Sequence, residues 1–119
     1  MTQSETGNLG EDLACEYLQN RGYEILERNW TPGRWGEADI IAIDNDALVL
    51  VEVRASSAPS MVSPQESVIP HKLYLLKNLV KLYNKMHPNL PQALRIDFVG
   101  VNLRNAKPPK IELFKNISG

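Results

Sequence analysis

The stretch GEADIIAIDNDALVLVEVRAS, residues 36–56, decides the fold of this chain. Its two apolar segments, residues 37–43 and 47–53, have the composition of strands, and the DND between them is a turn signal. The run LVLVEV in the second segment is typical of a strand that is buried on both faces. These residues therefore predict a β-hairpin.

Two acids, Asp39 and Glu52, occupy hairpin positions where a strand normally carries apolar side chains. If the hairpin turns symmetrically on Asn45 and Asp46, Asp39 lies directly opposite Glu52, with Cβ atoms about 5 Å apart. Two like charges at that distance repel, and a divalent cation would offset the repulsion, since Mg²⁺ is commonly bound through one or two carboxylates. The alternative is that both acids are buried polar residues with a structural role.

Arg54 follows Glu52 by two residues and therefore projects from the same side of the strand. A cation there can orient an attacking water or stabilise the charge that develops on a phosphorane-like transition state. The same acid-x-base triplet is also common in salt-bridged surface strands, although the apolar neighbours of Glu52 argue against exposure.

The remaining elements are predicted from periodicity and from turn residues. Apolar residues at steps of three and four from Leu9 predict a first helix in the segment that starts at Gly7, with Gly22 as its stop. A second helix opens at Ser63, is interrupted or restarted at Pro70, and stops at Pro88. Further strands are predicted at residues 23–30, 93–103 and 110–117, with a turn at 31–36 and a polar loop at 54–62. The order helix, three strands, helix, two strands predicts an α/β or α+β fold, with a mixed five-stranded sheet flanked by helices.

Length and composition are those of one globular domain spanning residues 1–119, with 43% hydrophobic and 23% charged residues. No apolar stretch approaches the ~20 residues that span a bilayer, and the polar start MTQSETGN does not look like a signal peptide. We therefore expect a cytoplasmic protein without membrane contact. Cys15 has no partner for an internal disulfide, and neither His71 nor His87 has neighbours at zinc-ligand spacing.

The charges are segregated along the chain, although the net charge is only −1. Residues 1–53 contain three Lys or Arg and eleven Asp or Glu, whereas residues 54–119 contain ten and three. This distribution would suit an acidic metal site beside a basic binding surface, or two halves that pair across the fold.

Glu11 and Lys72 are the candidate supporting residues of an acidic site. Glu11 follows Asn8 by three residues and could complete a capping box, or it could face the sheet edge near the acids. Lys72 lies in the middle of the apolar half of the second helix, from where its long side chain could reach a buried acid. The alternative is a lysine at a frayed helix start beside Pro70.

A basic stripe on the second helix is a candidate nucleic-acid contact, although such a stripe is most often a solvated helix face. Its residues are Lys77, Lys81 and Lys85. In the turn before Asp39, Arg34 could contribute with Trp30 and Trp35, whose rings could stack on an unpaired base or pack over the sheet. Glu37 could act as an outer ligand or be solvated, and the sequence assigns no role to Asp97.

Five segments together resemble, in order and spacing, the YraN-like family of small bacterial proteins. The segments are GNLGEDLACEYLQNRGYEILERNW, GEADIIAID, LVLVEVRAS, SPQESVIPHK and RIDFVGV. The resemblance covers the chain from about Gly7 to Val101. That family is placed among the endonuclease-like folds of the PD-(D/E)XK superfamily and looks similar to archaeal Holliday-junction resolvases.

The resemblance implies a restriction-endonuclease-like core, with Asp39 and Glu52 in the metal-binding positions and Glu11 as an auxiliary acid. It also implies Mg²⁺ or Mn²⁺ as cofactor, a nucleic-acid partner with DNA favoured, and a homodimer. One position departs from the motif, which ends in Lys where this chain has Arg54, and a second basic residue of the family is replaced by Ser56. Because Lys and Arg place their donors differently, we expect Lys72 to supply the ammonium group that Arg54 does not.

The leading hypothesis is therefore a metal-dependent phosphodiesterase that acts on nucleic acid and binds its cation through Asp39 and Glu52. Glu11 would assist, and Arg54 or Lys72 would position water and stabilise charge. The alternative is a non-catalytic nucleic-acid-binding protein on the same fold, which lost activity with the motif Lys. A third hypothesis, a protein-interaction module, predicts no salt-sensitive nucleic-acid binding.

Overall fold

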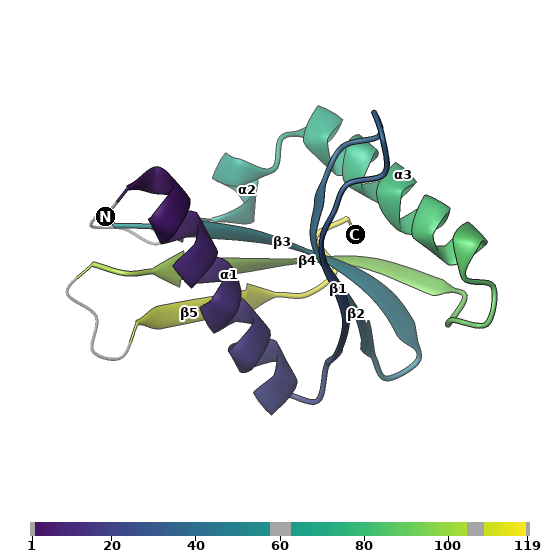
Figure 1. The fold of residues 1–119 in the computed structure, drawn as a ribbon, viewed down its shortest axis with the longest axis horizontal. Helices are drawn as coiled ribbons and strands as arrows, with labels where there is room; N and C mark the ends of the chain where they lie inside the picture. The colour runs from purple at the N-terminus through teal and green to yellow at the C-terminus, as the bar shows by residue number, and fades with distance from the viewer. Residues whose placement is uncertain (1, 58–62, 105–108, 119) are drawn as a thin grey trace.

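The computed structural model describes residues 2–57, 63–104 and 109–118 (Figure 1). The elements follow in the order α1 (Gln3–Asn20), β1 (Glu24–Trp30), β2 (Ala38–Asp44), β3 (Ala47–Ser56), α2 (Pro64–Ser67), α3 (Pro70–Met86), β4 (Ala93–Asn102) and β5 (Lys110–Phe114). This confirms the predicted order, with one refinement: the second predicted helix divides at Pro70 into a short α2 and a long α3. Most of the predicted polar loop lies outside the described residues.

The five strands form one mixed sheet in the order β1-β2-β3-β4-β5. The central pair, β3 and β4, is parallel, and the other neighbours are antiparallel. A parallel pair needs a crossover connection, which α2 and α3 provide. The mixed sheet flanked by helices is therefore confirmed, and its most buried strands are the two in the middle.

The two long helices cover opposite faces of this sheet. Figure 1 shows α1 crossing one face, and its Ala14 and Leu18 pack on the odd-numbered β3 residues Val49 and Val51. The apolar side of α3 packs instead on the even-numbered residues of β3, such as Leu50. Because neighbouring residues of a strand point to opposite faces, β3 is buried on both sides. The sequence prediction for LVLVEV is thereby confirmed.

The predicted register of the β2–β3 hairpin is correct. Ile40 pairs with Val51 and Asp44 with Ala47, with Asn45 at the positive φ of 54° that tight hairpin turns require. Strand β3 is longer than predicted, since it continues to Ser56 along β4. The end of β3 therefore extends past the start of β2, and this overhang lies at the acidic site.

Helix α1 begins earlier than the sequence analysis assumed. The Oγ1 of Thr2 accepts a hydrogen bond from the backbone of Glu5, whose Oε1 accepts one from the backbone of Thr2. This capping box fixes the helix start, so the capping role considered for Glu11 with Asn8 is wrong. At the other end, Gly22 has φ 89° and ends the helix as predicted.

A buried polar network lies at the turn end of the hairpin, remote from Asp39. Asp97, which is fully buried, accepts hydrogen bonds from Tyr23 Oη at 2.7 Å and from Arg95 Nε at 2.9 Å. Arg95 also reaches Asp44 at 2.6 Å, and Lys115 reaches the same carboxylate at 3.1 Å. These contacts give Asp97 a structural role in joining β1, β2, β4 and the segment after β5.

Within the part of the chain that the structure describes, no helix combines the length and the apolar character needed to cross a membrane.

Candidate metal and nucleic-acid site

The carboxylate of Asp39 lies at the point where the β2–β3 ladder ends. Ile40 and Val51 form the last backbone pair at this end, and beyond it the backbone N–H of Val53 donates to Asp39 Oδ2 at 2.9 Å. The side chain thus replaces the next backbone acceptor of the ladder. One oxygen of Asp39 therefore has the structural role that the sequence analysis kept open.

Glu52 is buried beside Asp39, with 1% of its surface exposed. Its Oε2 lies 3.1 Å from Arg54 Nη2 and 3.6 Å from Lys72 Nζ. Neither contact has hydrogen-bond geometry, so this oxygen has no hydrogen-bond partner. Among the residues that the structure describes, the other buried carboxylate oxygen in this condition is Oε1 of Glu11. A buried polar atom without a partner is costly, so both oxygens call for an explanation.

Burial is the main reason why the pKa of Glu52 rises to about 7. The nearby Asp39 carboxylate raises it further, both by its charge and by a hydrogen bond, while Lys72 and Arg54 act in the opposite direction. Two carboxylates that face each other in a water-poor environment favour one shared proton or one bound cation. A proton or a cation bound between Asp39 and Glu52 would therefore be stabilised by both carboxylates.

A polar pocket of about 520 Å³ opens beside Asp39. One wall consists of the first turns of α1, including Gln3, Thr6 and Glu11, and the other of Asp39 and residues 53–57. This contribution of the helix start was not predicted, because α1 begins at Gln3, before the predicted helix. The T-x-x-E pattern at the N-terminus, which is a capping-box signature, could have revealed it.

Glu11 faces this pocket from α1. Burial and the charge of Asp39 raise the pKa of Glu11, and the Nη2 of Arg28 lies 3.8 Å from its Oε1. The helix reaches the strand closely at the preceding residue, where a Cβ on Gly10 would lie 2.5 Å from the Cβ of Ala55. Only glycine permits this approach, which brings Glu11 to the wall of the pocket.

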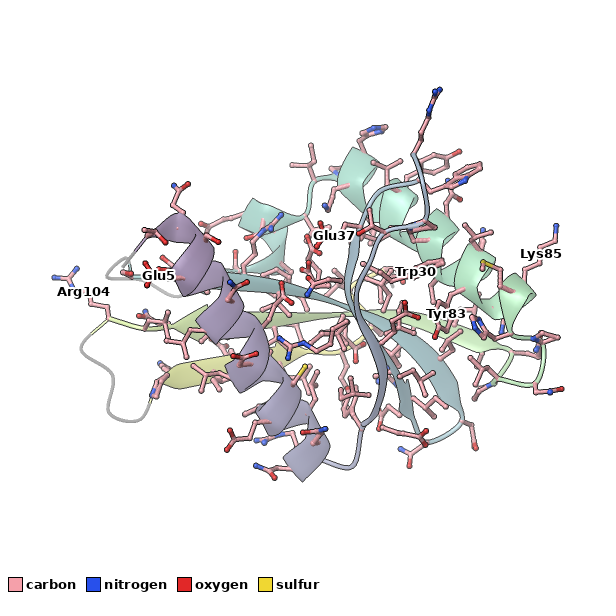
Figure 2. All side chains as sticks on the ribbon, in the orientation of Figure 1. Glu5, Trp30, Glu37, Tyr83, Lys85 and Arg104 are labelled. Carbon is pink, nitrogen blue, oxygen red and sulfur yellow. The ribbon has the colours of Figure 1, made fainter. Side chains whose placement is uncertain are left out.

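The described residues contain no group of three His, Cys, Asp or Glu side chains arranged to hold a metal ion. Asp39 and Glu52 are neighbours, while Glu11 lines the same pocket without joining them in such a group. Exposed Glu37 lies at the start of β2, and its charge contributes to the raised pKa of Glu11 (Figure 2). Of these acids, Asp39 and Glu11 line the pocket, whereas Glu52 and Glu37 are not among its lining residues.

Arg54 lines the pocket, but the other predicted basic residues are spread along α3 and the turn before β2. Lys72 is the one lysine of α3 with an ion pair to Glu52 in the described part of the chain. Lys85 lies about 20 Å further along the helix, at the end remote from Glu37 in Figure 2. Lys77 and Lys81 are exposed between them, and Arg34 is exposed in the turn before β2.

Trp30 and Trp35 differ in their surroundings. Trp30 packs edge-on against Tyr83 with ring centroids 4.9 Å apart, so it belongs to the core beneath α3. Trp35 is 64% exposed. The packing alternative is therefore correct for Trp30, whereas Trp35 remains available to a ligand.

The fold and site define a small α/β protein with two opposed carboxylates, a polar pocket and two adjacent cations. The sequence profile described as "Uncharacterised protein family UPF0102" matches residues 10–101, and the chain belongs to this family. This confirms the resemblance to the YraN-like proteins.

Three bacterial relatives illustrate the extent of the similarity. A UPF0102 protein of Flavobacterium psychrophilum is 41% identical over 95% of this chain and 92% of its own length. One from Dehalococcoides mccartyi is 39% identical over 98% and 95%, and one from Streptomyces coelicolor is 37% identical over 94% and 87%. The likeness thus extends over nearly the whole of each chain.

Proposed function

We propose that this protein is a Mg²⁺- or Mn²⁺-dependent phosphodiesterase that acts on nucleic acid, with DNA as the favoured substrate. One observation carries the proposal: Glu52 is buried opposite Asp39, and its Oε2 has no hydrogen-bond partner. A cation bound between the two carboxylates would remove both the repulsion and the unsatisfied oxygen.

The residues present fit a cation that is held by few protein ligands. Asp39 and Glu52 would bind it directly, and waters and a substrate phosphate would complete its coordination, as is usual for Mg²⁺. Glu11, across the pocket, would hold one of those waters through its Oε1, which has no hydrogen-bond partner. The bound cation would supply Lewis acidity and a more acidic water.

The chain's own cations act on the charge that develops on the phosphate. The side chains of Arg54 and Lys72 are 44% and 36% exposed, so each extends from buried Glu52 toward solvent. Donors held in this position stabilise a transition state that carries more negative charge than the substrate. Lys72 supplies a compact ammonium group next to Glu52. In the superfamily that the chain resembles, the motif lysine at the position of Arg54 would supply this group.

A second candidate is a nucleic-acid-binding protein without catalysis on the same fold. It is favoured by the ion pair between Arg54 and Glu52 at 3.1 Å. Because Arg54 already offsets the charge of Glu52, a cation would gain less from binding there. In both candidates the exposed lysines of α3 contact phosphates, and binding weakens steeply with salt.

The two candidates are separated by cleavage of plasmid and branched DNA in Mg²⁺, Mn²⁺ or EDTA. The isosteric variants Asp39→Asn and Glu52→Gln are compared with Asp46→Asn, which changes an exposed acid in the turn of the same hairpin. The phosphodiesterase predicts cation-dependent cleavage that both site variants abolish and the control retains. Salt-sensitive binding without cleavage, unchanged in all variants, would favour the second candidate.

The cation itself is tested by its effect on stability. A ligand that binds only the folded state raises the melting temperature, and the increase grows with the logarithm of the ligand concentration divided by Kd. We expect Mn²⁺ to raise Tm for the wild type and for Asp46→Asn, but not for Asp39→Asn. Sedimentation of the same samples, with and without branched DNA, tests the homodimer.

A further inference from the structure

Two aromatic side chains are exposed, and each is close in the sequence to a residue of the acidic site. The chain has two Trp, four Tyr and two Phe residues, all within the described residues. Six of them are buried or half-buried. The other two, Trp35 and Tyr74, are 64% and 61% exposed. Exposing large aromatic rings is unfavourable for folding, so these two positions are candidates for ligand contact.

Trp35 is held in a short turn that leads directly into the acidic strand. Its backbone N–H donates to the carbonyl of Pro32 at 3.1 Å, and a Cβ on Gly36 would meet Leu79 of α3 at 3.6 Å. The turn therefore leans on α3, as Figure 1 shows for the connection between β1 and β2. Trp35 precedes Asp39 by four residues, which span at most about 14 Å.

Tyr74 lies on the first turns of α3, two residues after Lys72. Because Lys72 Nζ is 3.6 Å from Glu52, this end of α3 is fixed beside the second acid of the site. The ring of His71 stacks on Tyr74 with centroids 6.5 Å apart. The two exposed rings thus stand on separate segments: Trp35 in the turn that leads into the strand of Asp39, and Tyr74 on the helix that carries Lys72.

The charges around the rings favour nucleic acid as the occupant over another protein. Arg34 precedes Trp35 and is exposed, and Tyr74 lies between Lys72 and Lys77. The core of a protein interface is depleted of charge, whereas aromatic rings interleaved with cations are the usual surface for single strands. A duplex keeps the faces of its bases stacked inside and offers these rings nothing to stack on.

We propose that Trp35 and Tyr74 stack on unpaired bases that flank the acidic pair, so that the preferred substrate has a single-stranded segment at the site. The proposal deepens the proposed function and rests on it for the cleavage of that segment. It accounts for the exposure of both rings, which lie four residues before Asp39 and two residues after Lys72.

Binding in EDTA tests the stacking separately from catalysis. Fluorescence anisotropy with a labelled single strand, a duplex and a splayed duplex is compared for the wild type, Trp35→Ala, Tyr74→Ala and Trp35→Phe. Met86→Ala is the matched control, since it removes another exposed apolar side chain from the far end of α3. Each alanine variant should lose about five- to 150-fold in affinity for the two substrates with unpaired bases. Trp35→Phe should keep most of the affinity, and duplex binding and Met86→Ala should be unchanged.

Cleavage of the same substrates in Mn²⁺ provides the second readout. Unchanged single-strand affinity in both alanine variants would overturn the stacking proposal, while the metal-dependent phosphodiesterase would survive if the wild type still cleaves. Loss of affinity in both variants without any cleavage by the wild type would support stacking and overturn the phosphodiesterase. An equal loss on duplex and single strand would also overturn the proposal. If the wild type binds no nucleic acid, the proposal fails.

Discussion

The Nζ of Lys72 lies 3.6 Å from the Oε2 of Glu52, which joins the first turn of α3 to the end of β3. Glu52 is thereby approached by two cations from different elements, Lys72 from the helix and Arg54 from its own strand. The proposed phosphodiesterase would use this second cation, since Lys72 brings an ammonium group to the acid.

Removal of the Lys72 ammonium should therefore lower the rate of cleavage. We expect Lys72→Ala to reduce kcat by about 10²-fold, the effect of losing one charged donor at a transition state, with little change in fold because the side chain is partly exposed. Lys110→Ala, an exposed lysine on β5, is the control. Steady-state cleavage kinetics provide the measurement, and an unchanged kcat in Lys72→Ala would refute its role.

The pH dependence of stability should reveal the buried carboxyl of Glu52. Burial, followed by the charge of Asp39, raises its pKa from 4.5 to about 7. Between these two values the unfolded chain loses a proton that the folded chain retains, so the free energy of unfolding falls as the pH rises through this window. Glu52→Gln should lack this decrease, whereas Asp46→Asn should retain it. Urea denaturation in EDTA across this range measures the effect, and parallel profiles for the wild type and Glu52→Gln would contradict it.

A methyl group on Gly10 should force α1 away from β3. Its Cβ would lie 2.5 Å from the Cβ of Ala55, so Gly10→Ala should lower the free energy of unfolding by about 1–3 kcal/mol, as overpacking does. Gly7→Ala is the matched control, because no atom lies within 4 Å of its Cβ, and it should stabilise the helix by about 0.5–1 kcal/mol. Equal stability of the two variants in urea would show that the close approach is unimportant.

The network around Asp97 should matter for stability and leave cleavage unaffected. Asp97→Ala removes one of the two acids that pair with Arg95 and the buried acceptor of the Tyr23 hydroxyl, and we expect a loss of about 3–5 kcal/mol. Glu112→Ala, an exposed acid on β5, should change stability little. Urea denaturation and cleavage by the folded fraction separate the two effects. A loss under about 1 kcal/mol would contradict the structural role.

The hairpin was predictable because its geometry depends on local residues. Asn45 adopts a positive φ readily, and a symmetric two-residue turn on Asn45 and Asp46 fixes the register of the two strands. The opposition of Asp39 and Glu52 follows from these facts alone. Lys72 was predictable for a similar reason, since helical periodicity shows a lysine on an otherwise apolar face.

The rest of the site depends on contacts between distant parts of the chain. The pocket forms where the first turns of α1 meet the overhanging end of β3. The local sequence of neither segment predicts that the two are in contact. The network of Asp44, Arg95 and Asp97 likewise joins strands that only the finished sheet brings together. Trp30 and Trp35 both lie next to the same predicted turn, so the sequence does not separate their roles. In the structure, Trp30 packs against Tyr83, whereas Trp35 is exposed.

The hydrogen bond from the Val53 backbone to Asp39 Oδ2 also limits how this acid can move. A carboxylate fixed to the backbone of the neighbouring strand cannot rotate freely, so its orientation is established when the sheet forms. An incoming cation or phosphate would therefore meet a preorganised ligand, and little entropy would be lost in ordering it. The same bond that ends the β2–β3 ladder thus sets the direction from which the site can be approached.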